Sequence, residues 1–188
     1  MSRKTACSSV LLVLICWAAL VVTASAQQFQ QVKGTLVSIS AGRNEAFGFD
    51  IKGAVWRFHP TTNSFGKVAH ATLVNIAVGG GTAAQLDEVW GINASGDVYR
   101  FNYTTKAFAQ VPANLSQIAV GPGYQDDCHP YEVWGINSAD AIFRFNFCSG
   151  LFDSIGGLLT QIATGGGDMW GLNNGAKFFT ITLLPRRS

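Results

Sequence analysis

Three observations predict an all-β fold, a β-propeller made of four-stranded antiparallel blades. A segment of the form Leu-x-x-Ile-small-x-Gly occurs four times, beginning at Leu36, Leu73, Leu115 and Leu159. An aromatic-Gly pair follows each copy, so that the aromatic residues recur about every 40 positions. No stretch of the repeats has an apolar period of comparable strength that would suit a helix. A period near 40 built from short strands and turns is typical of a propeller or a related repeat array.

A basic start, an apolar run and a small-residue site mark residues 1–26 as a secretory signal peptide. Arg3 and Lys4 precede an apolar run over residues 10–22. Ala24-Ser25-Ala26 then supplies the cleavage pattern. The run is shorter than the roughly 20 residues that span a bilayer. We therefore expect cleavage after Ala26, a secreted extracellular protein and no membrane span.

Charge and histidine content limit the partners and cofactors of the mature chain. Without the signal peptide, basic and acidic residues are equal in number, which gives no electrostatic basis for binding nucleic acid or an anionic membrane. The histidines His59, His70 and His129 do not group with cysteines at zinc-binding spacing. We expect no metal and no other cofactor.

The two cysteines that follow the signal peptide, Cys128 and Cys148, are predicted to form a disulfide. They lie at equal distances from an expected turn at residues 138–140, and so at matching heights on the two arms of a hairpin. Cross-strand neighbours are within disulfide reach. An oxidising secretory route permits the bond.

Each repeat resolves into four strand-like runs. In the clearest copy these are residues 115–120, 132–137, 141–146 and 151–155, with Gly, Ser, Asp or Pro at the turns. The third run alternates aromatic residues with Val, Ile or Arg, the period of two expected of a sheet that is packed on both faces. The fourth run has the form Phe-x-x-Val or Phe-x-x-Ile. A four-stranded antiparallel sheet per repeat follows.

The order of the runs suggests how the propeller closes. The repeat units are expected at residues 33–68, 69–111, 112–155 and 156–188. A lone copy of the fourth run, Phe29-Gln30-Gln31-Val32, precedes the first unit, and the last unit lacks this run. We therefore expect residues 29–32 to pair with residues 177–182 as a closing strand, which would hide two sheet edges.

The Leu-x-x-Ile-x-x-Gly segment and the Val-Trp-Gly-Ile-Asn segment that follows it resemble the tectonin repeat of tachylectin-type and fish-egg lectins. The resemblance extends from Phe29 to about Asn173. It implies a propeller of secreted or surface-facing character, in a family whose members bind glycans and bacterial lipopolysaccharide in innate defence. Such propellers usually have five or six blades, whereas this chain offers three complete units and a partial one. The chain either closes as a small four-bladed ring, or is a truncated or mis-spliced form of a longer one.

Two repeated columns are candidates for sugar contact. The indoles of Trp90 and Trp134 could stack on the apolar side of a sugar ring, although packing between blades is the favoured explanation for an aromatic residue in every unit. Arg57, Arg100 and Arg144 share one position of the third run, where a guanidinium could grip sugar hydroxyls or phosphates with paired donors. Hydrogen bonding between blades or exposure to solvent explains these arginines equally well.

The connections between the first and second runs vary in length while the runs do not. Variable loops on a constant scaffold are where binding specificity is usually built. Asp127 and Tyr131 lie in the longest connection and are candidate carbohydrate-binding residues, although solvated charge is the commoner explanation for carboxylates in loops. The two longer connections also carry Asp87, Glu88, Tyr124, Asp126, His129 and Glu132.

Asparagine follows the second run at Asn93, Asn137 and Asn173, where its side chain can cap the ensuing turn. Asn93, Asn102 and Asn114 also begin Asn-x-Ser or Asn-x-Thr sequons. In a eukaryotic source we expect a glycoprotein with sugars on some of these residues. A residue that carries such a glycan would lie outside any ligand site.

The sequence favours binding over catalysis. No nucleophile motif, Gly-rich phosphate loop or metal-binding spacing accompanies the carboxylates and histidine near residue 127, so we do not expect an enzyme. We predict a lectin that presents several similar shallow sites, whose weak contacts with glycans or lipopolysaccharide add up to avidity. The alternative is a propeller that binds a partner protein without affinity for sugar. An oligomer is compatible with either function.

Overall fold

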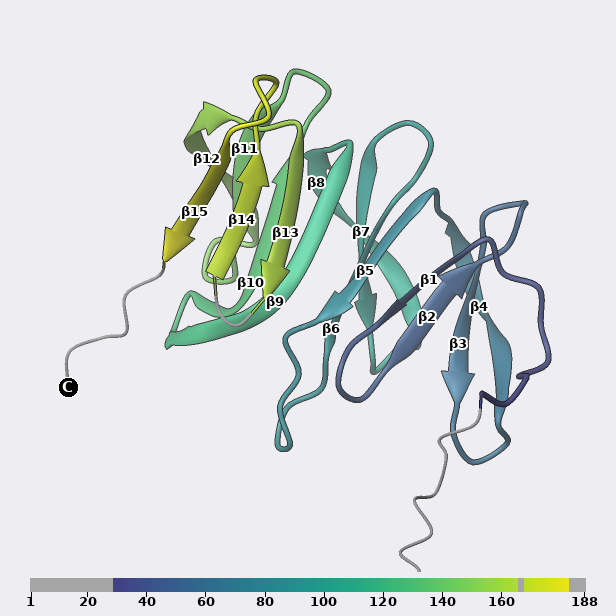
Figure 1. Cartoon of the computed structure of the whole chain (residues 1–188). Helices are drawn as coiled ribbons and strands as arrows, with labels where there is room; N and C mark the ends of the chain where they lie inside the picture. The colour runs from purple at the N-terminus through teal and green to yellow at the C-terminus, as the bar shows by residue number, and fades with distance from the viewer. Residues whose placement is uncertain (1–28, 166–167, 183–188) are drawn as a thin grey trace, which may run out of the picture. The chain divides into compact units, whose positions relative to one another are not determined.

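The computed structural model describes residues 29–165 and 168–182, and these residues form an all-β structure (Figure 1). The chain divides into two units, residues 1–31 and 32–188, and every strand belongs to the second. The predicted signal peptide, residues 1–26, lies outside the described residues. Four successive groups of strands carry the four repeats, and we call them blades 1 to 4.

The strands follow the chain blade by blade. Blade 1 consists of β1 (Ser38–Ala41), β2 (Ala46–Phe49), β3 (Ala54–His59) and β4 (Ser64–Thr72). Blade 2 consists of β5 (Asn75–Gly79), β6 (Glu88–Ile92), β7 (Asp97–Asn102) and β8 (Ala107–Asn114). Blade 3 consists of β9 (Gln117–Asp126), β10 (His129–Ile136), β11 (Ala141–Asn146) and β12 (Leu151–Leu158). Blade 4 consists of β13 (Gln161–Gly165), β14 (Asp168–Leu172) and β15 (Phe178–Thr182).

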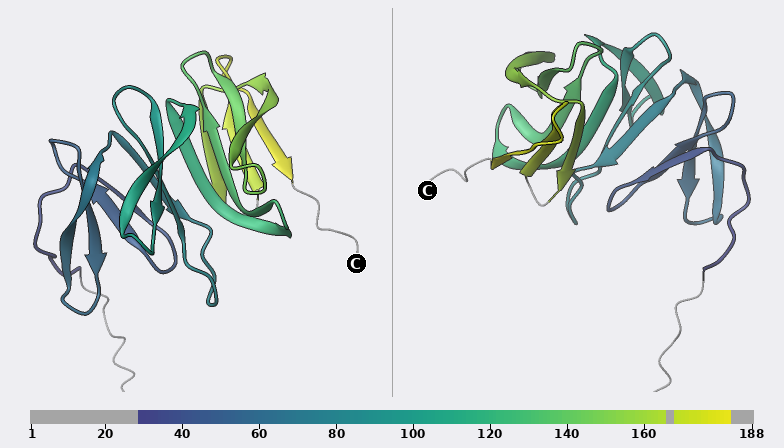
Figure 2. Two further views of the ribbon diagram at one scale, coloured as in Figure 1. Left: turned by 180° about the vertical axis from the view of Figure 1, so that it is seen from behind. Right: turned by 45° about the horizontal axis from the view of Figure 1, so that its top comes forward.

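Consecutive strands within each blade pair antiparallel, as predicted. The first strands of successive blades contact one another, β1 with β5, β5 with β9 and β9 with β13 (Figures 1 and 2). One parallel bridge, between Ala69 and Ala107, also connects β4 to β8. This succession of antiparallel sheets is the β-propeller architecture that the repeat period predicted.

The repeated leucine and glycine of each unit fit each other inside one blade. Leu73 precedes β5 and is fully buried, and its side chain fills the space that a Cβ at Gly91 would need. Leu115 and Gly135 stand in the same relation in blade 3. A larger residue in place of the glycine would displace the leucine, which explains why the two residues recur together.

The repeated aromatic residue of the second strand packs between blades. Phe47 of blade 1 makes edge-to-face contacts with Phe101 and Phe108 of blade 2, with ring centroids 5.0 Å and 6.4 Å apart. Trp90 of blade 2 contacts the two corresponding phenylalanines of blade 3, at 4.7 Å and 5.8 Å. Each junction between these blades therefore has its own aromatic core, which supplies much of the buried area.

The fourth strands β4, β8 and β12 continue past the unit ends that the sequence suggested. Each of them pairs with the third strand of its blade, and a β-bulge interrupts the register. Beyond the bulge, the end of the fourth strand pairs with the first residue of the third strand. Thr72, for example, lies opposite Ala54. The bulge adds residues on one strand only, so the pattern of Phe-x-x-Val marks the beginning of these strands but not their ends.

Residues 29–32 form no strand in the described structure. Phe29 is fully exposed, and Lys33 forms an isolated bridge with Ser64 of β4. Among the described strands, β15 pairs with β14 alone. The pairing of residues 29–32 with residues 177–182 is not among the described strand pairs and stays a prediction.

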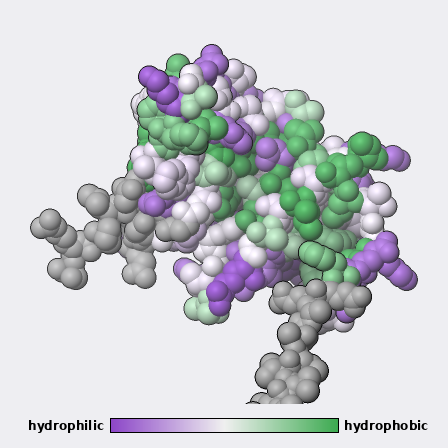
Figure 3. All heavy atoms as spheres, viewed as in Figure 1, coloured by the Kyte–Doolittle hydropathy of each residue, from purple (hydrophilic) through white to green (hydrophobic). Residues whose placement is uncertain are grey.

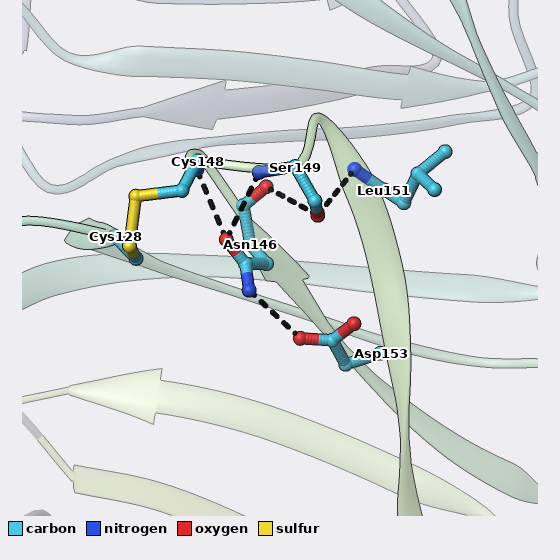
Figure 4. Close-up of a disulfide and its surroundings, with 6 residues drawn as sticks. All are labelled: Cys128, Asn146, Cys148, Ser149, Leu151 and Asp153. Atoms are coloured by element: carbon cyan, nitrogen blue, oxygen red, sulfur yellow. Dashed lines mark hydrogen bonds between the residues drawn. A yellow bond between two sulfur atoms is a disulfide. The ribbon is translucent and has the colours of Figure 1, made fainter.

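The predicted disulfide between Cys128 and Cys148 is confirmed, with 4.9 Å between the two Cα atoms (Figure 4). Cys128 precedes β10 and Cys148 follows β11, the two arms of the predicted hairpin, and Phe147 N donates to Cys128 O. Asn146 Oδ1 accepts hydrogen bonds from Cys148 N and Ser149 N, at 3.0 Å and 3.2 Å. The bond therefore fixes a capped turn at one end of blade 3.

Candidate functional site

Every third-strand arginine forms a two-pronged ion pair with a glutamate of its own blade. In blade 2, Arg100 Nε and Nη2 donate to the two carboxylate oxygens of Glu88, each at 2.7 Å. The pairing follows from the register, because Arg100 lies opposite Trp90 and Glu88 lies two residues before that tryptophan on the same face. The equivalent pairs are Arg57 with Glu45 and Arg144 with Glu132.

The glutamates of these pairs are buried, and the arginines cover them. The side chains of Glu88 and Glu132 are 9% and 2% exposed, compared with 39% and 18% for Arg100 and Arg144. Trp90 Nε1 adds a hydrogen bond of 2.9 Å to Glu88, and Trp134 Nε1 does the same to Glu132 at 2.8 Å. The carboxylates are thus fully supplied with donors.

Guanidinium groups also stack on aromatic rings where two blades meet. Arg57 lies 5.8 Å from the ring centroid of Phe47 and 5.6 Å from that of Tyr103 in blade 2. Its hydrogen bond with Glu45 raises the pKa of Arg57, so this guanidinium keeps its charge. Arg100 lies 5.0 Å from the ring centroid of Phe147 in blade 3. Such cation–π contacts orient the guanidinium between neighbouring blades.

The ion pair of Arg100 and Glu88 lines an open groove with a volume of about 390 Å³. Arg100 uses Nε and Nη2 for Glu88, which leaves Nη1 as a donor toward the groove. Asn102 accepts hydrogen bonds at its Oδ1 from two backbone amides, and its Nδ2 is a second donor when this sequon carries no glycan. The groove is lined by Glu88, Arg100, Phe101, Asn102, Tyr103, Ala109 and Val111.

Tyr103 gives this groove a fixed aromatic wall. Its hydroxyl donates to Asp87 O at 2.7 Å. Burial, assisted by the charge of Glu45, raises the pKa of Tyr103 well above its ordinary value, so the hydroxyl stays protonated. The guanidinium of Arg100, the amide of Asn102 and the ring of Tyr103 therefore surround one concave surface, which can accept a polyhydroxylated ligand.

The structure separates the predicted site residues into several places. Trp90 and Trp134 are buried, and no face of either indole is open to a ligand. Tyr131 contacts Phe147, and its hydroxyl donates to Leu86 O at 3.0 Å. Asp127 is exposed in the turn next to the disulfide. Arg100, by contrast, lines an open groove.

Asp87, which the sequence marked as a loop carboxylate, holds two blades together. Its buried carboxylate accepts hydrogen bonds from four backbone amides, three of them in blade 1 and one in blade 2. The donors are Arg43 N, Asn44 N, Glu45 N and Gly81 N. The position of Asp87 in the longer connection was compatible with sugar contact or with solvated charge, whereas three of its four donors lie in the preceding repeat. Its role is structural.

The asparagines after the second strands cap turns as predicted. Asn93 Oδ1 accepts from Ser95 N and Asp97 N, each at 2.9 Å, and Asn137 and Asn173 make the same pair of contacts. The sequons differ in how the amide nitrogen is engaged. Asn93 Nδ2 donates to Asp97 Oδ2, and Asn114 Nδ2 donates to Ser95 O. Asn102 is exposed, and its Nδ2 is free of such bonds within the described part of the chain.

Two further features are absent from the described ranges, a metal-binding cluster and a membrane-spanning helix. Residues 29–165 and 168–182 contain no group of three or more His, Cys, Asp or Glu side chains that could hold a metal ion. In the same part of the chain, no helix is long and apolar enough to cross a bilayer.

The Tectonin domain family model matches residues 17–186. No curated protein matches the chain. Among solved structures, human WBSCR16 is similar with a TM-score of 0.60 at 13% identity, covering 82% of this chain and 49% of that one. Prp20p from Saccharomyces cerevisiae is similar with a TM-score of 0.60 at 14% identity, covering 79% and 44%. The chain thus spans about half the length of these two structures.

The SapL1 lectin, solved in complex with alpha methyl fucoside, is also similar, with a TM-score of 0.51 at 14% identity. The alignment covers 81% of this chain and 64% of SapL1. At these identities the solved structures support the fold alone, which is a β-propeller in agreement with the blades described above.

Proposed function

This chain belongs to the tectonin domain family, and on that basis we propose that it is a secreted, non-catalytic lectin for glycans or bacterial lipopolysaccharide. The observation that carries the proposal is the groove at Arg100, where an arginine with unused donors lies beside Tyr103 and Asn102. The lectin complex with alpha methyl fucoside supports a sugar as the class of ligand for this fold.

The groove suits sugars and phosphorylated sugars for physical reasons. The free edge of a guanidinium can donate two parallel hydrogen bonds to vicinal hydroxyls or to a phosphate. Because Glu88 already neutralises Arg100, the site attracts no strong counter-ion and suits neutral sugars as well as anionic ones. Shallow, water-exposed contacts of this kind bind weakly one by one, and avidity comes from repetition.

The test blocks the groove without breaking the ion pair. Ala109 is exposed and lines the groove, so Ala109→Trp fills it while Arg100 and Glu88 stay paired. We expect the variant to lose at least about 10-fold in affinity on glycan arrays and immobilised lipopolysaccharide, with an unchanged melting temperature. Ala139→Trp, in an exposed turn outside the groove, is the matched control and should bind like the parent.

Two outcomes would overturn the proposal. If Ala109→Trp binds like the parent, the site lies elsewhere. If the parent binds no glycan and no lipopolysaccharide, the protein-interaction alternative is favoured. Solved structures of the same fold make that alternative concrete, because YCF48 was solved bound to D1 peptide, with a TM-score of 0.51 to this chain.

A further inference from the structure

The junctions between blades repeat the same contacts at the same positions of the repeat. The aromatic residue of one blade shares a core cluster with the first-strand isoleucine of the next blade. These pairs are Phe47 with Ile76, Trp90 with Ile118, and Trp134 with Ile162. All six residues are buried. A blade in this protein therefore offers an aromatic face on one side and an isoleucine face on the other.

The aromatic face of blade 4 is uncovered in the described structure. Trp170 occupies the position of Phe47, Trp90 and Trp134 but is 48% exposed. Gly165 has open space where a Cβ would lie, whereas a Cβ at Gly121 would meet Thr164 of the following blade at 2.8 Å. A surface hollow of about 360 Å³ adjoins Trp170.

The opposite face of blade 1 is uncovered in a matching way. Ile39 occupies the position of Ile76, Ile118 and Ile162 but is 62% exposed. Phe58 and Phe65 contact each other, with ring centroids 5.4 Å apart. Figure 3 shows apolar side chains gathered over blade 1 and over the last strands, at the two ends of the series of blades.

Polar groups at the two faces are complementary as well. At the junction of blades 3 and 4, Gln117 Oε1 accepts a hydrogen bond of 2.9 Å from Ile162 N. Gln161 is the equivalent residue of blade 4 and is exposed. The equivalent donor for Gln161 would be the backbone amide of an Ile39.

We propose that the chain self-associates head to tail, with Trp170 of one copy packed against Phe58, Phe65 and Ile39 of a second copy. A second copy is the occupant because its blade 1 carries a phenylalanine pair and an isoleucine at the positions that cover Phe47 and Trp90 inside the chain. The two faces of one copy do not cover each other, since Trp170 and Ile39 are both exposed. Such an interface is heterologous, so each copy keeps one free face of each kind until a ring closes.

The first experiment measures mass against concentration by sedimentation velocity on the purified mature chain, residues 27–188, and on three variants of it. Trp170→Glu removes the aromatic face, and Phe65→Glu removes the receiving face. Leu86→Glu, at an exposed apolar residue of the β5–β6 loop, is the matched control. The parent and the control should associate, and each face variant should associate about 10-fold or more weakly.

The second experiment mixes the two face variants. Each retains one intact face, so the mixture should form dimers that neither variant forms alone and should not proceed to larger species. A parent that stays monomeric at all concentrations, or face variants that associate like the parent, would overturn the proposal. Failure of the mixture to form dimers would also overturn it, because it would exclude a head-to-tail contact.

A measurement on the parent protects the test against variants that misfold. In the chain without the predicted signal peptide, which contains Trp17, Trp170 is exposed, Trp56 is half-buried, and Trp90 and Trp134 are buried. Acrylamide quenching of tryptophan fluorescence then reports mainly on Trp170 and Trp56. Quenching should increase as the parent is diluted. Quenching that is independent of concentration would contradict the proposal.

Discussion

Single arginines neutralise buried glutamates in blades 1 to 3, and the degree of burial sets how strongly each pair affects stability. Removing the arginine of an exposed ion pair costs little stability, because water then solvates the carboxylate of its former partner. A buried carboxylate that loses its partner keeps its charge in a poor solvent, which is far more costly. Glu132 is the most buried of the three glutamates, so blade 3 is the most sensitive.

We predict that Arg144→Ala lowers the free energy of unfolding by about 3 kcal/mol, because it leaves the buried carboxylate of Glu132 without a charged partner. Adding Glu132→Gln should recover part of this loss, since the amide removes the charge and still accepts the hydrogen bond from Trp134. Urea denaturation of both variants measures the difference. Equal stability of the single and double variants would show that the buried charge is not the cause.

The sequence predicted the arginine column but not the glutamates that hold it. Arg57, Arg100 and Arg144 stood out because they recur in the best-patterned strand. The glutamate two residues before each aromatic residue also recurs in these blades, and that spacing was a usable signal. Recognising the pair requires the register of the second and third strands, which brings residues 12 positions apart onto one face.

Blade 4 is the element in which the repeated cluster is incomplete. Asp168 takes the place of the glutamate, and Thr180, opposite Trp170, takes the place of the arginine. Asp168 Oδ1 is buried without a hydrogen-bond partner in the described structure. The pairing of β14 with β15 is nevertheless formed, so backbone hydrogen bonds and the Leu159–Gly171 fit suffice to keep the three strands together.

We predict that the double variant Asp168→Glu, Thr180→Arg restores the cluster and raises the free energy of unfolding by about 1 kcal/mol, the upper end for an ion pair that is partly exposed to solvent. The matched control is Asp168→Glu with Thr180→Lys, which adds the same charge without the planar fork and should gain less. Thermal denaturation followed by circular dichroism compares the variants. A gain that is equal for lysine and arginine would assign the effect to charge alone.

The disulfide links the β9–β10 turn to the β11–β12 turn at one end of blade 3. Because it closes a loop with a sequence separation of 20, its removal should lower the free energy of unfolding by roughly 3 kcal/mol in the chain-entropy model. Cys128→Ala with Cys148→Ala is the variant, and urea denaturation is the measurement. A reductant should destabilise the parent and leave the double variant unaffected, and the opposite pattern would contradict the prediction.

At the scale of elements, the sequence predicted the strands well because each run has its own pattern and the pattern recurs. It did not predict the ends of β4, β8 and β12, since bulges are not visible in alternation alone. It also did not predict the role of Asp87, whose four donors come mainly from the preceding blade. Local patterns do not reveal which neighbour a loop residue will contact.

The whole molecule is predicted to leave the cell without its first 26 residues, because the basic start and apolar run have the features of a secretory signal. Expression of the full chain in a secreting host, followed by N-terminal sequencing, should give a mature protein that begins at Gln27. Retention in the cell, or a mature start far from Gln27, would contradict this. Changing Ala24 and Ala26 to large residues should block processing.

The contacts that join the blades run from each blade to the next one along the chain, and this has a consequence for how many blades the protein tolerates. Since the faces of blades 2 and 3 are alike, a duplicated copy of residues 73–114 inserted after Asn114 would find a suitable neighbour on each side. As far as these core contacts are concerned, blade number is then a modular property, open to change by duplication of one unit.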